Sequence, residues 1–223
     1  MRASVLTVVV ISRNGPRLLA SILRENERRL DSLIFYKTGP VSFQEKEIPP
    51  SIQEEILKAA TSCTWLGRWK LLIITDKNQR VSVVKAWQED LKRIGRPKDV
   101  DWIERWKLAP LFIAFCQPKD FKPFQWVPGE YARIGEIHEI GSAVRSIEPK
   151  ALEYGIGLHG PIMGLLMPEV NRGMRTVLGI PEDYELVHFG IVGYPKEEVD
   201  VTFPQLSDVS FAERWGNPWA LRD

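Results

Sequence analysis

Residues 155–164 have the sequence GIGLHGPIMG, and they follow a long helical pattern over residues 130–154. Four glycines within these ten residues predict that the helix ends here and that the chain turns, because glycine adopts backbone conformations that other residues avoid. Glycines also allow the main chain to approach a flat ligand closely. The glycines alone leave a second interpretation open, in which this stretch is a helix cap followed by an ordinary loop.

The residues after this turn predict a short helix and then a strand. Pro168 and Gly179 are typical of the first position and the end of a helix, so we expect a helix over 168–178. The apolar run over 185–192 is expected to form a strand, which ends at Gly193-Tyr194-Pro195.

Upstream of the turn, helical and strand patterns alternate. We expect helices over 50–61, 79–94 and 99–108, and strands over 70–75 and 111–116. Both strands are apolar at successive residues, which predicts that each is buried on its two faces. Residues 117–130 are expected to form a long structured loop, and Pro149 is expected to kink the long helix. These elements predict an α+β domain in which helices flank a small sheet.

The order of these elements, with the turn at 161–164, Leu178-Gly179-Ile180-Pro181 and the Gly-Tyr-Pro exit, resembles the FMN-dependent nitroreductase family. The match covers about residues 37–195 and is densest over 139–195. The chain resembles a divergent member of this family. It implies a small, mostly antiparallel sheet flanked by helices, an intertwined homodimer, and one FMN in each of two clefts between the subunits. It also implies an NAD(P)H oxidoreductase, in which a nicotinamide reduces the flavin and an electron-poor acceptor, such as a nitroaromatic or a quinone, takes the hydride.

The resemblance assigns the flavin ring to the glycine-rich turn. The matching segment is Pro161-Ile162-Met163-Gly164, and the backbone N–H of Met163 is implied to face the flavin N5. The helix before the turn has the small residues that support the dimer core in this family. They are Gly141, Ala143, Ala151 and Gly155, with Glu139 at the matching spacing.

Residues 62–69 match the family segment that contacts the polar edge of the flavin, but only in part. Ser62 and Trp69 match, whereas Trp65 stands where the family has an asparagine, and Gly67 and Arg68 replace Gln-Pro. An indole cannot accept a hydrogen bond as an amide can, so Trp65 would stack on the ring or block it. Arg68 would place a positive charge near the N1–O2 edge of the reduced flavin. The alternative is that Arg68 is a surface arginine.

The phosphate anchor of the family is also only partly present. Lys37, Thr38 and Gly39 occupy its basic segment, but Val41 fills the slot of the second base. The basic pair that normally follows Gly-Tyr-Pro is missing, and Lys196 and Arg214 are the candidates to replace it. Each charge-assisted hydrogen bond to a phosphate contributes about 1.5–3 kcal/mol. An alternative therefore stays open, in which the chain is a degenerate member with weak or altered flavin binding and no redox turnover.

No catalytic residue is assigned firmly, because the flavin carries out the chemistry in such sites. His159, within the glycine-rich stretch, is a weak candidate to orient a substrate or donate a proton, and Arg68 is a second weak candidate. The alternative for His159 is an ordinary loop histidine. The three histidines, at 138, 159 and 188, have no spacing typical of metal ligands, so no metal site is expected.

Composition limits the remaining possibilities. The formal charge of the 223-residue chain is +1, which argues against a nucleic-acid-binding surface. Two distant cysteines predict a reducing, cytoplasmic location. The apolar run over 5–11 is too short to span a membrane. We expect residues 1–36 to form an arm or helix of uncertain role, 37–195 the FMN-binding domain, and 196–223 an extended tail on the partner subunit.

Overall fold

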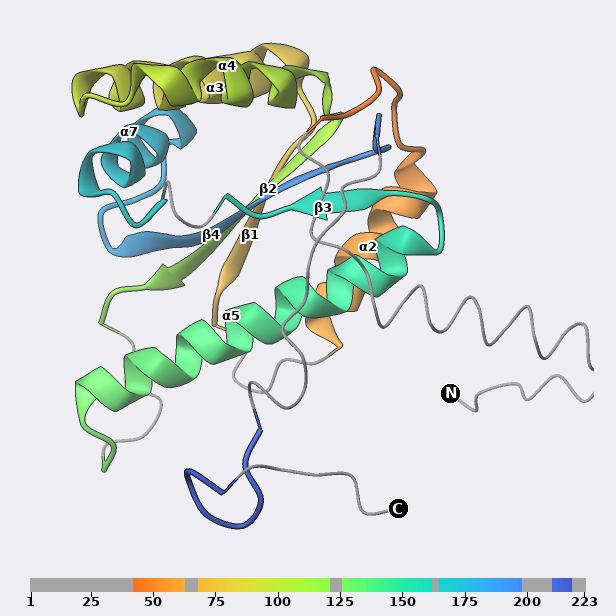
Figure 1. Ribbon diagram of the computed structural model, residues 1–223. Coiled ribbons are helices and arrows are strands. Elements are labelled where there is room, and N and C mark those ends of the chain that lie inside the picture. Colours follow the sequence, from red (N-terminus) through yellow and green to blue (C-terminus); the bar gives the residue numbers. More distant parts are fainter. Residues whose placement is uncertain (1–41, 63–67, 121–125, 162–164, 198–209, 218–223) are drawn as a thin grey trace, which may run out of the picture.

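A four-stranded antiparallel sheet forms the centre of the protein in the computed structural model, which describes residues 42–62, 68–120, 126–161, 165–197 and 210–217. The strand order is β1-β2-β4-β3, and Figure 1 shows helices on both faces of this sheet. The strands are β1 (Lys70–Ile74), β2 (Leu111–Pro118), β3 (Gly157–His159) and β4 (Tyr184–Gly193). The predicted α+β fold with a small antiparallel sheet is confirmed.

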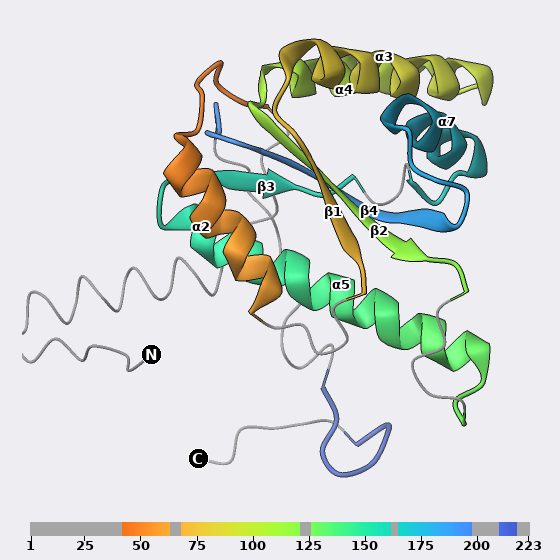
Figure 2. The ribbon, with the colours of Figure 1, turned by 180° about the vertical axis from the view of Figure 1, so that it is seen from behind.

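The helices form two layers, one on each face of the sheet. One layer contains α2 (Pro50–Thr61) and α5 (Gly129–Leu152), which pack against each other. The other contains α3 (Lys77–Arg93), α4 (Val100–Glu104) and α7 (Pro168–Leu178). Single 3₁₀ turns, η1 (Pro97–Asp99) and η2 (Arg105–Leu108), flank α4. Figures 1 and 2 show the two layers from opposite sides of the molecule.

The ends of the helices follow from local capping residues. The carboxylate of Asp76 accepts a hydrogen bond from the backbone N–H of Gln79 at 2.8 Å, which caps α3. α2 and α7 begin with proline, and α7 ends at Gly179, whose φ of 63° is left-handed. The predicted helix at 168–178 and the predicted strand at 185–192 are thus confirmed, each to within a residue.

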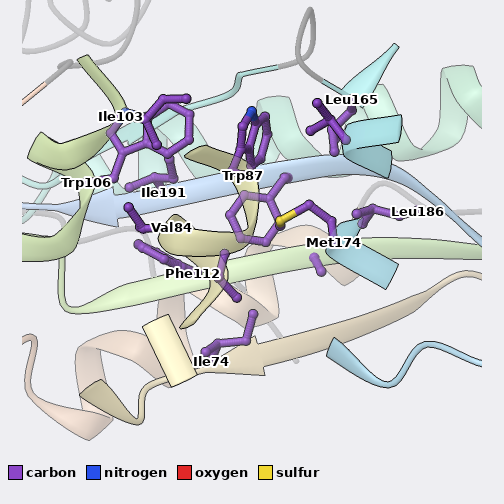
Figure 3. Close-up of a cluster of buried hydrophobic side chains, with 14 of the residues drawn as sticks. Ile74, Val84, Trp87, Ile103, Trp106, Phe112, Leu165, Met174, Leu186 and Ile191 are labelled. Carbon is purple, nitrogen blue, oxygen red and sulfur yellow. The ribbon is translucent and has the colours of Figure 1, made fainter. Parts of the chain in front are cut away.

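The core is divided by the sheet into two apolar clusters. On the side of α3, the rings of Trp87 and Trp106 meet edge to face at 5.1 Å, and Phe112 and Phe189 do so at 5.6 Å. Figure 3 shows the helical residue Met174 within this cluster, against the strands. On the side of α5, the second cluster packs the opposite faces of β2 and β4 against the helix. The central strands are therefore buried on both faces, as predicted for 111–116.

β1 differs from its prediction, because Leu72 and Ile73 are each 36% exposed. The cause is its position at the edge of the sheet, where it pairs with β2 alone among the described strands. An apolar run identifies a strand but does not indicate how many neighbours will cover it.

The segment after α5 also differs from its prediction. The glycine-rich sequence predicted a turn, but Gly157–His159 form β3, whose residues pair with β4 from Gly193 to Ile191. Pairing with a neighbouring strand here outweighs the low strand propensity of glycine. α5 continues through Pro149, and Figure 1 shows it as one continuous helix. The proline removes one helical hydrogen bond, the one from residue 149 to the carbonyl of residue 145, and only three residues of the helix follow it.

In the described part of the chain, no helix combines the length and the apolar character that a membrane span requires.

Candidate functional site

A cavity of about 580 Å³ opens where β3 ends and the predicted flavin turn begins. Its walls come from α3, from the segment with η1 and α4, from the end of β3, and from the residue before α7. The described lining residues are Trp87, Leu91, Arg96, Asp99, Trp102, Ile103, His159, Gly160, Pro161 and Met167. A volume of this size is typical of small-molecule sites. The predicted site residues His159 and Pro161 both line this cavity.

Three aromatic rings form one wall of the cavity region. Trp102 meets Trp106 at 5.0 Å and His159 at 5.2 Å, both edge to face. Trp106 is fully buried, whereas Trp102 is 37% exposed. The buried indole and the imidazole therefore hold Trp102 in place while part of its ring stays open to a ligand.

The charged groups of the described lining belong to two residues. The Nε atom of Arg96 lies 2.6 Å from Oδ2 of Asp99, and their side chains are 53% and 38% exposed. This ion pair presents donors and acceptors side by side, while its two charges compensate each other. The remaining described lining residues, apart from His159, are apolar side chains and Gly160.

His188 lies on the opposite side of Gly160 from this cavity, on β4. A Cβ atom built on Gly160 would lie 2.8 Å from Cε1 of His188 and 3.0 Å from its Nε2. Burial, together with a smaller effect of the nearby His159, lowers the pKa of His188 to about 4. The imidazole is therefore neutral at pH 7, and no described residue forms a hydrogen bond with its buried Nε2. His188 is not among the predicted site residues, although a histidine within the apolar run over 185–192 indicates a buried polar group.

Most of the predicted cofactor contacts lie outside the described residues. These are Lys37, Thr38, Gly39, Trp65, Gly67, Ile162, Met163 and Gly164. Arg68 is exposed just before β1, Lys196 is exposed just after β4, and Arg214 is exposed in the segment 210–217. These three cations do not appear among the described residues that line the cavity.

The chain after the predicted phosphate anchor runs beside the Gly-Tyr-Pro exit. Phe43 pairs with Pro195 in an antiparallel bridge, and the backbone N–H of Lys196 donates to the carbonyl of Ser42 at 3.1 Å. The first described residues after the predicted anchor, Ser42 and Phe43, therefore lie beside Lys196. The Ser42 hydroxyl donates to the carboxylate of Glu197 at 2.8 Å, which brings a negative charge to the same neighbourhood.

Cys116 on β2 offers no nucleophilic chemistry. Its side chain is buried, and burial raises the pKa of the thiol to about 11. Thiolate is the reactive form, so this residue stays inert at neutral pH.

No protein-family model matches the sequence, and no curated protein is similar to it in sequence. The structure, however, is similar to an FMN-dependent nitroreductase from Clostridium difficile, with a TM-score of 0.61 at 17% identity over 80% of this chain and 96% of that one. The chain adopts the nitroreductase fold. A BluB-like flavoprotein from Clostridium difficile shares this fold, with a TM-score of 0.66 at 13% identity over 83% of this chain and 99% of that one. An NADPH:FMN oxidoreductase from Vibrio harveyi complexed with NAD⁺ also shares it, with a TM-score of 0.63 at 17% identity over 87% of this chain and 80% of that one.

Within the nitroreductase fold, the described residues suit a flavin unequally at its two ends. At the end expected to hold the flavin ring, Gly160 and the buried Pro161 precede the predicted turn and line an apolar, aromatic cavity. At the phosphate end, Lys196 is accompanied by Glu197. The ring end therefore fits a flat cofactor, and the phosphate end offers less positive charge than a phosphate would be expected to need.

Proposed function

We propose that this chain is an FMN-dependent NAD(P)H oxidoreductase of nitroreductase type, which reduces an electron-poor acceptor such as a nitroaromatic or a quinone. The observation that carries the proposal is the position of Gly160 and Pro161, which begin the predicted flavin turn at the edge of an aromatic-lined cavity in the nitroreductase fold. Bound FMN would accept a hydride from the nicotinamide and pass it to the acceptor. The residues of the chain would bind and orient the ring and exclude water.

The proposed ring contacts come from two segments. Pro161, Ile162 and Gly164 shape the turn, and the backbone N–H of Met163 donates to the flavin. Trp65, Gly67 and Arg68 lie at the polar edge, where the cation of Arg68 favours the reduced anion.

The proposed phosphate contacts are Lys37, Thr38 and Gly39, with Lys196 and Arg214 as replacements for the missing bases. His159 is the candidate to orient the acceptor, because its ring lines the cavity next to Trp102.

A second candidate function rests on the acid at the phosphate end. Glu197 accepts a hydrogen bond from Ser42, one residue beyond the missing base at Val41. A carboxylate there repels a phosphate. In this alternative the chain keeps the fold but binds FMN weakly and does not turn over.

We also propose a homodimer that forms through α5. Along its first turns, Tyr131, Ile134 and Ile137 are 60%, 51% and 43% exposed, and their spacing places them on one face of the helix. Trp126, just before α5, is 80% exposed. A second copy of the chain would cover this apolar stripe, and the tail over 196–223 would extend onto it.

With two cysteines in the whole chain, we place the protein in the cytoplasm.

The deciding experiment is an absorbance spectrum of the purified protein, taken before and after FMN is added and the excess is removed. Flavin bands that persist support the oxidoreductase, and a protein that stays colourless favours the degenerate alternative. Lys37→Ala is expected to weaken FMN binding about tenfold or more, whereas Lys92→Ala, an exposed residue of α3, is the matched control. An unchanged FMN affinity in Lys37→Ala would overturn the anchor assignment.

A separate variant tests the turn. Met163→Pro removes the backbone N–H proposed to face the flavin N5. We expect a shifted flavin reduction potential and slower turnover with a nicotinamide and a quinone. If both survive in a variant that still binds FMN, the role of Met163 is wrong.

A further inference from the structure

The Trp102 cavity, as we call the 580 Å³ cavity described above, extends beyond the residues proposed to contact FMN. It shares Gly160 and Pro161 with the flavin turn, but most of its described wall comes from α3 and from the segment over 96–103. We propose that this cavity is a binding site for a second small molecule, a neutral, planar aromatic compound of about two fused rings with one polar edge. This inference does not rest on the chain being a flavoenzyme.

The shape of the wall favours a flat ring. Trp102 is held by two edge-to-face contacts, with Trp106 at 5.0 Å and with His159 at 5.2 Å, and it still leaves 37% of its surface open. Aromatic rings prefer such edge-to-face or offset partners. Met167 has a flexible thioether side chain that adapts to rings of different outline.

The charges of the wall select a neutral ligand. Arg96 is the only cation among the described lining residues, and it already pairs with Asp99 at 2.6 Å. An anionic ligand such as a phosphate would therefore have to compete with Asp99 for the guanidinium. A neutral ring with a hydroxyl or carbonyl at one edge meets both a donor and an acceptor in the pair, without separating them.

The test uses 2-naphthol, a neutral two-ring aromatic alcohol, as the probe and isothermal titration calorimetry of the full-length protein as the readout. We expect saturable binding of one 2-naphthol per chain. Trp102→Leu keeps an apolar side chain but removes the ring, and we expect it to weaken binding about tenfold. The matched control is Trp215→Leu, which removes an indole that is 90% exposed in the segment 210–217. Equal affinities in the two variants would overturn the proposal.

A charge swap tests the polar edge separately. Asp99→Asn releases Arg96 from its counter-charge, so binding of naphthalene-2-sulfonate is expected to strengthen several-fold relative to 2-naphthol. If the ratio of the two affinities does not change, the ion pair does not face the ligand.

Two further measurements keep the inference independent of folding defects and of FMN. In the wild-type protein, nuclear Overhauser effects between 2-naphthol and the indole of Trp102 are expected, and effects only to tryptophans that do not line the cavity would contradict the site. The titration is repeated with saturating FMN, whose own binding is followed by absorbance. Unchanged 2-naphthol affinity supports a second site, and full competition would show that the cavity belongs to the flavin.

Discussion

His188 on β4 packs directly beneath Gly160, and a methyl group at residue 160 would lie only 2.8 Å from Cε1 of the imidazole. Gly160 therefore has two neighbours: it lines the Trp102 cavity, and it packs against the buried imidazole of His188. His188 in turn meets the ring of Phe115 at 5.4 Å, so it has little room to withdraw. The glycine is therefore required by packing as well as by the approach of a ligand.

Gly160→Ala is accordingly expected to destabilise the fold by about 1–3 kcal/mol, because the methyl group forces the imidazole out of its position. The free energy of unfolding in urea measures this change. The control is a double-mutant cycle with His188→Ala, in which the smaller side chain leaves room for the methyl group. A coupling energy near zero would contradict the packing argument.

His188 also predicts how stability depends on pH. Its pKa is about 4 in the folded protein, against 6.5 for an exposed histidine. Above pH 6.5 both the folded and the unfolded chain keep this imidazole neutral, so its full contribution is present. Between pH 6.5 and 4 only the unfolded chain takes up the proton, and stability falls by up to about 3 kcal/mol.

The measurement is the unfolding free energy of the wild type and of His188→Gln at several pH values. The difference between them is expected to shrink as the pH falls from 6.5 to 4 and to stay constant above 6.5. His138→Gln, at an exposed position of α5, is the control and should leave the pH dependence unchanged. His159 lies close to His188, so a residual slope in His188→Gln is tested by adding His159→Gln. Parallel pH profiles for the wild type and His188→Gln would refute the low pKa.

The sequence predicted those parts of the fold that depend on local signals. Pro168 and Gly179 set the ends of α7, and the apolar run over 111–116 identified a strand buried on both faces. β1 was predicted as a strand but not as an edge strand, because its neighbours are decided by the topology of the sheet. β3 was missed, since three residues that begin with a glycine form a strand only when β4 is alongside.

The candidate site was predictable only where a residue could be identified by its type and order along the chain. His159 and Pro161 were predicted and lie together in the Trp102 cavity. Its other walls escaped prediction, because Arg96, Asp99 and Met167 come from segments that only the folded chain brings together. Trp102 is one of eight tryptophans in the chain, and no local pattern indicates that it is partly exposed beside His159 while Trp106 is buried.

Arg80 is expected to be essential to stability although it has no role in the site. Its buried guanidinium donates to the carbonyl of Pro110 at 2.7 Å and also to that of Thr75, which connects the start of α3 to the end of the edge strand β1 and to the start of β2. Both bonds come from Nη1, and because the lysine side chain is one atom shorter, its ammonium does not reach the position of Nη1 between the two carbonyls. Arg80→Lys is expected to cost about 2–4 kcal/mol in urea unfolding. Lys77→Met, which breaks the exposed pair with Glu45, should cost less than about 1 kcal/mol, and equal losses would contradict the argument.

The contact between α3 and α7 predicts an unusual effect of a helix glycine. Replacing glycine by alanine inside a helix normally stabilises a protein by about 1 kcal/mol. At Gly173 of α7, however, the new Cβ would lie 1.8 Å from Oδ2 of Asp90, a buried carboxylate whose Oδ1 pairs with Arg93 at 2.9 Å. Gly173→Ala is therefore expected to lower the melting temperature and to destabilise the protein by about 1–3 kcal/mol.

The control removes the carboxylate and leaves the helix unchanged. In an Asp90→Ala background there is no side chain to collide with, so the same Gly173→Ala change should become neutral or stabilising. This reversal of sign separates a packing conflict between the two helices from a general intolerance of α7 to substitution. A Gly173→Ala variant that is more stable than the wild type, with Asp90 in place, would show that α7 can move away from α3 at no cost.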